Sequence, residues 1–224
     1  MIAVTADVVA QGAGGGIGWT DSVGMLLTRG GYVMIPLMLL SVVSIALIVE
    51  RLIFWIAVNG KTSLRRLARL NQALRTGDSA LVRGLMTDDG TPYGCVARRL
   101  VEEGANDAVA LEVVEDQRGR LDRYLVTMST IITAAPLLGI LGTVLGIIQS
   151  FELLGGQSTL TDPTEVAGGI AAALLTTAFG LIVALVTLFP YMSFRGQSNR
   201  AMGRLEALVA AAQEGQRRQA GDTS

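Results

Sequence analysis

Two apolar stretches of the chain carry small and hydroxyl side chains along one face of a helix. At 100° per residue, the first set lies within an arc of about 100° in residues 124–152; its members are Ser129, Pro136, Gly139, Thr143, Gly146 and Ser150. Residues 166–194 repeat the pattern with Gly169, Ala173, Thr176, Thr177, Gly180, Ala184 and Thr187. Hydroxyl groups donate and accept hydrogen bonds without titrating near neutral pH. These stripes can therefore solvate and orient another group.

The types of residue that the chain lacks narrow its chemistry. Neither stripe contains Asp, Glu, Lys or Arg, so an acid at membrane depth must come from a partner. The sequence has no His and a single cysteine, Cys95. This excludes histidine-dependent nucleophiles, His-containing metal sites and an internal disulfide. We predict no catalytic residue, no metal and no cofactor, and an intramembrane enzyme is the least favoured alternative.

Two interpretations of the stripes stay open. In the first, small residues let the helix backbones approach closely, as the spacing of Gly142 and Gly146 suggests. The residues assigned to this packing are Pro136, Gly139, Gly142, Gly146 and Gly180.

In the second interpretation, the hydroxyls line a narrow wet lumen. Thr143 lies 8 residues from Phe151, and Thr177 lies 11 residues from Val166. These separations correspond to depths of about 12 and 16 Å by helix rise. Hydroxyls at a similar depth on facing helices suit an ion pathway. We expect Thr143 and Thr177 to line it, with Thr176 and Thr187 as secondary polar lining.

The composition identifies the elements that carry these residues as membrane spans. The 224 residues are 50% hydrophobic and 17% charged, with a mean hydropathy of +0.49. A soluble monomer this apolar could not cover its surface with polar groups. The net charge of −1 provides no basic field to attract nucleic acid. Three apolar runs, 32–49, 124–151 and 166–194, are long enough to span a bilayer.

Cation counts predict the topology. Residues 51–123 hold 12 Lys or Arg and residues 195–224 hold 5, whereas residues 1–31 hold only Arg29 and residues 152–165 hold none. Positive residues stay on the cytoplasmic side. We therefore predict the following order: a periplasmic segment 1–28, a first span 29–58, a cytoplasmic helical region 59–123, a second span 124–152, a periplasmic loop 153–165, a third span 166–194 and a cytoplasmic tail 195–224.

The cytoplasmic parts are predicted to be helical. Ser63 is a candidate N-cap with Gly77 as a stop, and a second helix begins near Asn106 or Asp107. We expect that helix to continue without a break through residues 107–151. Glu50 and Arg51 end the first apolar run near the headgroups, where an arginine can extend toward water. Cys95 is expected to be an inert thiol that is at least half-buried.

The two stripes also resemble a known family. The stretch from Ala135 to Phe151, APLLGILGTVLGIIQSF, looks like the second-span signature of the MotA/TolQ/ExbB proton-channel family. The stretch from Gly169 to Leu181, GIAAALLTTAFGL, is similar to its third-span signature, and ExbB and TolQ are the nearest members. Arg29-Gly-Gly and Ile48-Val-Glu-Arg51 resemble the first-span region.

The resemblance implies an all-α, multi-pass protein of the bacterial inner membrane. It implies a homo-oligomer, pentameric in the family, whose central lumen surrounds the single span of an ExbD- or TolR-like partner with a membrane Asp. It also implies that ion flow produces mechanical work, passed to a TonB- or TolA-like protein for import or envelope maintenance. Thr143 and Thr177 match the family's second- and third-span threonines.

One position departs from the family pattern. Many ExbB and TolQ proteins carry a Glu five residues before the third-span threonine, where this chain has Ala172. The identity of the ion and the details of coupling therefore stay open. Two further alternatives are a non-conducting membrane scaffold and a stator of a gliding or flagellar-type motor.

Overall fold

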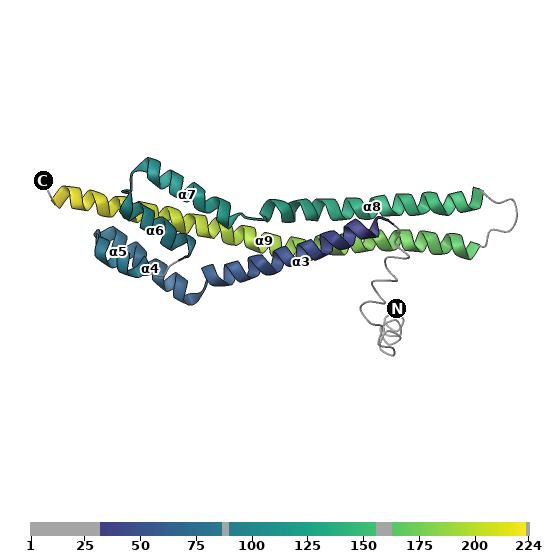
Figure 1. Cartoon of the computed structure of the whole chain (residues 1–224), viewed down its shortest axis with the longest axis horizontal. Helices are drawn as coiled ribbons and strands as arrows, with labels where there is room; N and C mark the ends of the chain where they lie inside the picture. The colour runs from purple at the N-terminus through teal and green to yellow at the C-terminus, as the bar shows by residue number, and fades with distance from the viewer. Residues whose placement is uncertain (1–31, 87–89, 156–162, 223–224) are drawn as a thin grey trace, which may run out of the picture. The chain divides into compact units, whose positions relative to one another are not determined.

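The computed structural model describes residues 32–86, 90–155 and 163–222. Every regular element in this part of the chain is a helix, and Figure 1 follows them in order: α3 (Met34–Val58), α4 (Lys61–Thr76), α5 (Ser79–Met86), α6 (Pro92–Glu102), α7 (Asp107–Leu121), α8 (Leu125–Gly155) and α9 (Pro163–Asp222). The predicted all-α fold is confirmed. The predictions for residues 1–28, for Arg29-Gly-Gly and for most of the loop 153–165 lie outside the described residues.

Three of the helices are long and apolar enough to cross a membrane. They include α3, α8 and the first half of α9, and each has a mean hydropathy of 2.3 over its most apolar window. Much of their surface consists of exposed Leu, Ile, Val and Phe side chains, of which Leu39, Leu137 and Phe189 are examples. In water such a surface would be costly, whereas lipid and neighbouring helices cover it without cost. The chain is therefore a membrane protein, and its described part contains three candidate spans.

The third span continues far beyond the bilayer as one helix. α9 has 60 residues, about 90 Å at 1.5 Å per residue, against a hydrocarbon core of about 30 Å. Its later part carries Met202, Leu205 and Leu208, which are buried in a core shared with α4 to α7. This confirms the expected extension of the third span.

The second span differs from the prediction. The expected continuous helix over residues 107–151 is wrong, because α7 ends at Leu121 and α8 begins at Leu125. Between them the backbone of Tyr124 adopts a left-handed conformation, with φ at 66°. A helix cannot continue through such a residue. Gly119 does not cause the break, since it lies inside α7.

The described chain divides into two units. The first contains the described residues up to Val42 and Thr133–Ala184, and the second contains Val43–Ile132 and the chain from Leu185 onward. In the second unit, α4 to α7 lie beside the C-terminal part of α9 (Figure 1). They share an apolar core that includes Trp55, Leu70, Tyr93, Val113, Leu121 and Leu205.

Local capping sets the ends of α4, α6 and α7. Gly77 ends α4 in a left-handed conformation, as predicted, but α4 begins at Lys61 rather than after Ser63. Thr91 caps α6 by accepting a hydrogen bond from the amide of Gly94, and Asn106 caps α7 by accepting one from the amide of Val109. These side chains satisfy amides that the first turn leaves unpaired.

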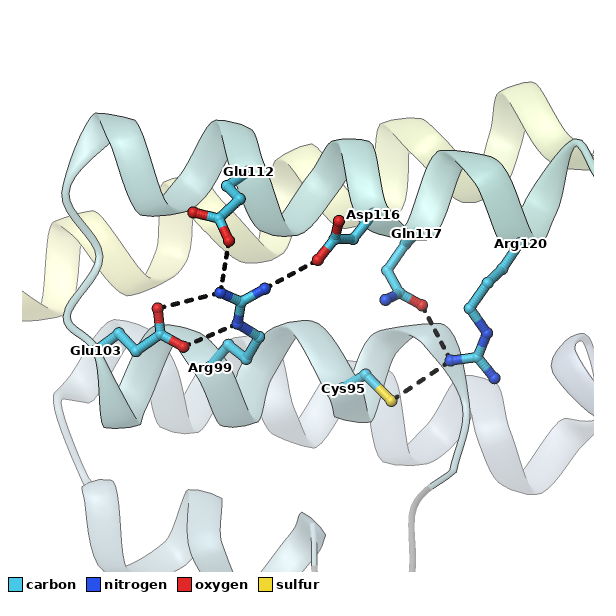
Figure 2. A network of polar contacts seen from close by, with 7 residues as sticks. All are labelled: Cys95, Arg99, Glu103, Glu112, Asp116, Gln117 and Arg120. Carbon is cyan, nitrogen blue, oxygen red and sulfur yellow. Dashed lines mark hydrogen bonds and ion pairs between the residues drawn. The ribbon is translucent and has the colours of Figure 1, made fainter.

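An ion-pair network joins α6 to α7, as Figure 2 shows. The guanidinium of Arg99 contacts the carboxylates of Glu103 at 2.8 Å, Glu112 at 2.9 Å and Asp116 at 2.9 Å. The hydrogen bonds that Arg99 donates to Glu103 and Glu112 raise the pKa of Arg99, and the bond to Glu103 lowers the pKa of that carboxyl group. Cys95 is half-buried, and its sulfur lies 3.7 Å from Nη1 of Arg120.

Candidate functional site: the threonine pair of α8 and α9

The small residues of α8 and α9 face each other within the first unit. A Cβ atom added to Gly139 would lie 2.9 Å from Cα of Thr177, and one added to Gly180 would lie 2.5 Å from the carbonyl oxygen of Ala135. At Gly146 the added atom would lie 2.6 Å from Cβ of Ala173. Separations below 3 Å leave no room for a side chain, so the glycines permit this close approach.

Gly142 belongs to the same contact because an added Cβ would overlap the hydroxyl of Thr176. Pro136 lies inside α8 and is half-buried. It has no amide proton, so it removes one hydrogen bond from the helix ladder just below Gly139. The assignment of these residues to helix approach stays a prediction for the assembled protein.

The close approach brings Thr143 and Thr177 together. Their hydroxyl oxygens are within hydrogen-bond distance of each other. Thr177 also donates to the carbonyl oxygen of Gly139 at 2.8 Å, while Thr143 lies 3.2 Å from the carbonyl oxygens of Gly139 and Ala173. Two hydroxyls on separate helices therefore share one small polar site.

Counting protons shows what this site can do. Each hydroxyl has one proton to donate and two lone pairs to accept with. If Thr177 donates to Gly139, Thr143 can donate to Thr177 and keep its own lone pairs available. If Thr177 donates to Thr143 instead, it gives up its bond to Gly139, and Thr143 donates to the carbonyl oxygen of Gly139 or Ala173. Such a pair can exchange the donor and acceptor roles without carrying a charge.

Burial separates the four predicted threonines into two kinds. Thr143 and Thr177 are half-buried, so part of each side chain stays accessible in the single chain. Thr176 and Thr187 are buried, with exposed fractions of 1% and 0%. Thr176 donates to the carbonyl of Ala173 at 2.7 Å. Lining roles for all four threonines stay predictions, and burial makes Thr143 and Thr177 the stronger candidates.

Thr187 has its own partner within the second unit. Its hydroxyl lies 2.6 Å from the hydroxyl of Ser44 on α3, and Ser44 is also buried. Ser44 was not among the predicted site residues, although a serine within an apolar span is a signal for such an interhelical bond.

The predicted environment of Arg51 is wrong. It was expected to extend toward water, but its side chain is 1% exposed and contacts the end of α7. A charged residue flanked on both sides by apolar sequence was a visible signal for an internal partner.

Comparison with known proteins now places this helix pair. Residues 93–207, just over half of the chain, match the MotA/TolQ/ExbB proton channel family. The chain belongs to this family. The matched range contains α8, the threonine pair and the apolar part of α9. The resemblance of the two span signatures is therefore confirmed.

Individual relatives agree with this membership. The chain is 35% identical to the ExbB-like 3 biopolymer transport protein of Synechocystis over 175 residues, covering 74% of this chain and 81% of the relative. It is 26% identical to biopolymer transport protein exbB1 of Vibrio cholerae over 201 residues, covering 83% and 85%. It is 35% identical to the Tol-Pal system protein TolQ of Pseudomonas aeruginosa over 104 residues, covering 46% and 44%.

Family and structure together establish the general character of the chain. It is a multi-pass protein of the inner membrane, in a family of transport and channel proteins rather than enzymes. Members of the family generally work with ExbD- or TolR-type partners.

Proposed function

We propose that this chain is an ExbB/TolQ-like stator subunit. With an ExbD/TolR-like partner, it forms a proton channel that converts ion-motive force into mechanical work for TonB- or Tol-type energy transduction. The observation that carries the proposal is the hydroxyl pair of Thr143 and Thr177, half-buried between two family-signature helices. The output is import of biopolymers or nutrients, or maintenance of the envelope.

The pair suits a partner carboxyl group in both protonation states. A hydroxyl can donate to a carboxylate, and it can accept a hydrogen bond from a carboxylic acid. Thr143 and Thr177 together offer both roles, and carbonyl oxygens of Gly139 and Ala173 accept whichever proton is not used. The pair thus lowers the cost of bringing the partner's acid to membrane depth without fixing its charge.

The proposed assembly follows from the missing acid. Both small-residue stripes lack charged residues, so the titrating group belongs to a single-span partner with a membrane Asp. Several copies of this chain, five in the pentamer that the resemblance implies, surround the partner's spans. A TonB- or TolA-like protein receives the mechanical output.

The proposed topology places the N-terminus in the periplasm and the C-terminus in the cytoplasm. Of the 18 Lys and Arg residues, 17 lie in 51–123 and 195–224, and positive residues stay inside. In this orientation α4 to α7 and the later part of α9 are cytoplasmic.

The experiment is proton flux into liposomes that contain this chain with its partner. The partner to co-express is a single-span protein with one Asp in its span, sought in the neighbouring reading frame. We expect flux only when both proteins are present, and loss of flux when the partner's Asp is changed to Asn. Assembly without partner-dependent flux would contradict the proposal.

That negative result would favour the non-conducting scaffold. The scaffold has one specific observation in its favour: the glycines of α8 and α9 are already used in packing within a single chain. Stable complexes with the partner, together with absent flux, distinguish it from a failure to assemble.

A further inference from the structure

Arg51 lies where a charge is costly. It follows Glu50 in α3, apolar residues flank this charged pair on both sides, and 1% of the Arg51 side chain is exposed. A buried charge is tolerated only when other groups replace the water that it loses. Its contacts therefore identify what it does.

The guanidinium of Arg51 binds the end of α7. Nη1 donates to the carbonyl oxygens of Arg120 and Leu121, both at 3.2 Å. Nε donates to the carboxylate of Glu50 at 3.0 Å. The same group lies 4.7 Å from the ring centre of Phe54 and 5.4 Å from that of Tyr124.

These contacts complement the C-terminus of a helix. The last carbonyls of a helix have no partner within it, and they form the negative end of its dipole. A planar guanidinium can bind two such oxygens together, which a lysine ammonium does less well. Arg51 thus caps α7 from another helix.

The capped end is also the place where the second span begins. Three residues separate Leu121 from Leu125, and Tyr124 among them has the left-handed backbone conformation. A second helix, α9, contacts the same junction: its buried Ser198 donates a hydrogen bond to the carboxylate of Asp122 at 2.5 Å. Side chains of α3 and α9 therefore both hold the same short junction.

We propose that Arg51 is a positioning residue that fixes the junction between α7 and α8, and with it the start of the second span. α8 carries Thr143 eighteen residues beyond its first residue, Leu125. A loosened junction would let α8 shift or rotate along its axis, so the hydroxyl pair would lose its alignment. This effect on ion flow rests on the proposed function, whereas the anchoring of the junction does not.

The anchoring is tested by hydrogen exchange on the full chain in lipid nanodiscs. The variants are Arg51→Met, which keeps the apolar stem, and Arg51→Lys, which keeps the charge. The matched control is Arg118→Met, because the Arg118 side chain is exposed and forms its ion pair with Glu115 of the same helix. The readout is exchange of the hydrogen-bonded amides of Asp122, Leu125 and Met128, with α4 as the internal reference.

We expect exchange at the junction to become about tenfold faster in Arg51→Met, because local opening follows the loss of hydrogen bonds to a charged group. Arg51→Lys should show a smaller increase, and Arg118→Met none. Unchanged junction exchange in Arg51→Met, or equal acceleration in α4, would overturn the proposal. If Arg51→Met does not fold, Arg51→Lys and Ser198→Ala supply the same test.

Proton flux separates this inference from the proposed function. Selective opening of the junction with reduced partner-dependent flux supports both. Selective opening with unchanged flux overturns the link between Arg51 and transport. If Thr143→Val and Thr177→Val leave flux intact, the proposed function fails while the exchange result at the junction stands.

Discussion

Replacement of Thr143 by valine removes the hydroxyl and keeps the shape of the side chain. Valine is branched at Cβ like threonine, so the packing against Ala173 and Gly139 should change little. The change takes away the hydroxyl–hydroxyl contact with Thr177 and one of the two groups that could meet a partner's carboxyl. Thr177 keeps its 2.8 Å bond to the Gly139 carbonyl.

The expected magnitudes differ between stability and transport. One interhelical hydrogen bond within a membrane contributes about 0.6 kcal/mol to stability, so assembly should survive. A buried carboxyl that loses its partner costs about 1–3 kcal/mol, which corresponds to roughly a 5- to 150-fold effect. We therefore expect the complex to remain intact while transport falls by roughly 5- to 150-fold.

The assay is partner-dependent proton flux in liposomes, with the quantity of assembled complex measured in the same preparation. Thr177→Val should behave like Thr143→Val. Thr130→Val provides a matched control, because Thr130 lies exposed near the start of α8 and its hydroxyl bonds to the carbonyl of Val126. Full flux in both pair variants would refute the hydroxyl argument, and loss of assembly in either would assign the threonines to packing.

Two further predictions concern packing and pH. Gly180→Val should prevent the close approach of α8 and α9, since its Cβ would lie 2.5 Å from the carbonyl oxygen of Ala135. Gly168→Val is the control and should leave this approach unchanged, because nothing lies within 4 Å of a Cβ at that position. The unfolding temperatures of the two variants in nanodiscs are compared. The hydrogen bond from Arg99 lowers the folded-state pKa of Glu103, so this ion pair contributes to stability above the unfolded-state pKa of about 4.3 and loses its contribution as pH falls through the folded-state pKa. Arg99→Met should therefore flatten the decline in unfolding temperature between about pH 5 and 2. An unchanged decline would contradict this prediction.

The spans were predictable because their signals are local. An uninterrupted apolar run indicates a span wherever it occurs, and the small residues at helical spacing marked the faces of α8 and α9 that meet. The N-cap at Asn106 and the stop at Gly77 follow from side-chain and backbone chemistry within a few residues. The sequence predicted a similar depth for Thr143 and Thr177 but not their hydrogen bond, and the structure brings the two hydroxyls together.

The break between α7 and α8 could not be predicted from local sequence signals. Residues 122–124 are Asp, Arg and Tyr, none of which ends a helix as reliably as proline or glycine. At this break, Arg51 of α3 binds two carbonyl oxygens at the end of α7, and Ser198 of α9 binds the side chain of Asp122. Contacts across 69 to 76 residues carry no local signature, so only the position of the charged pair Glu50-Arg51 between two apolar stretches pointed to them.

The residues of the two stripes fall into two groups by their contacts within the chain. The glycines are consumed by contact between α8 and α9, since at Gly139, Gly146 and Gly180 an added Cβ would lie within 3 Å of the facing helix. Thr176 is buried in the same contact. Thr143 and Thr177 remain half-buried, and their hydroxyls meet at the margin of that contact. Close packing by glycine therefore brings the two uncharged hydroxyls together, and a bulkier residue at Gly139 should separate them, because its Cβ would lie 2.9 Å from Cα of Thr177.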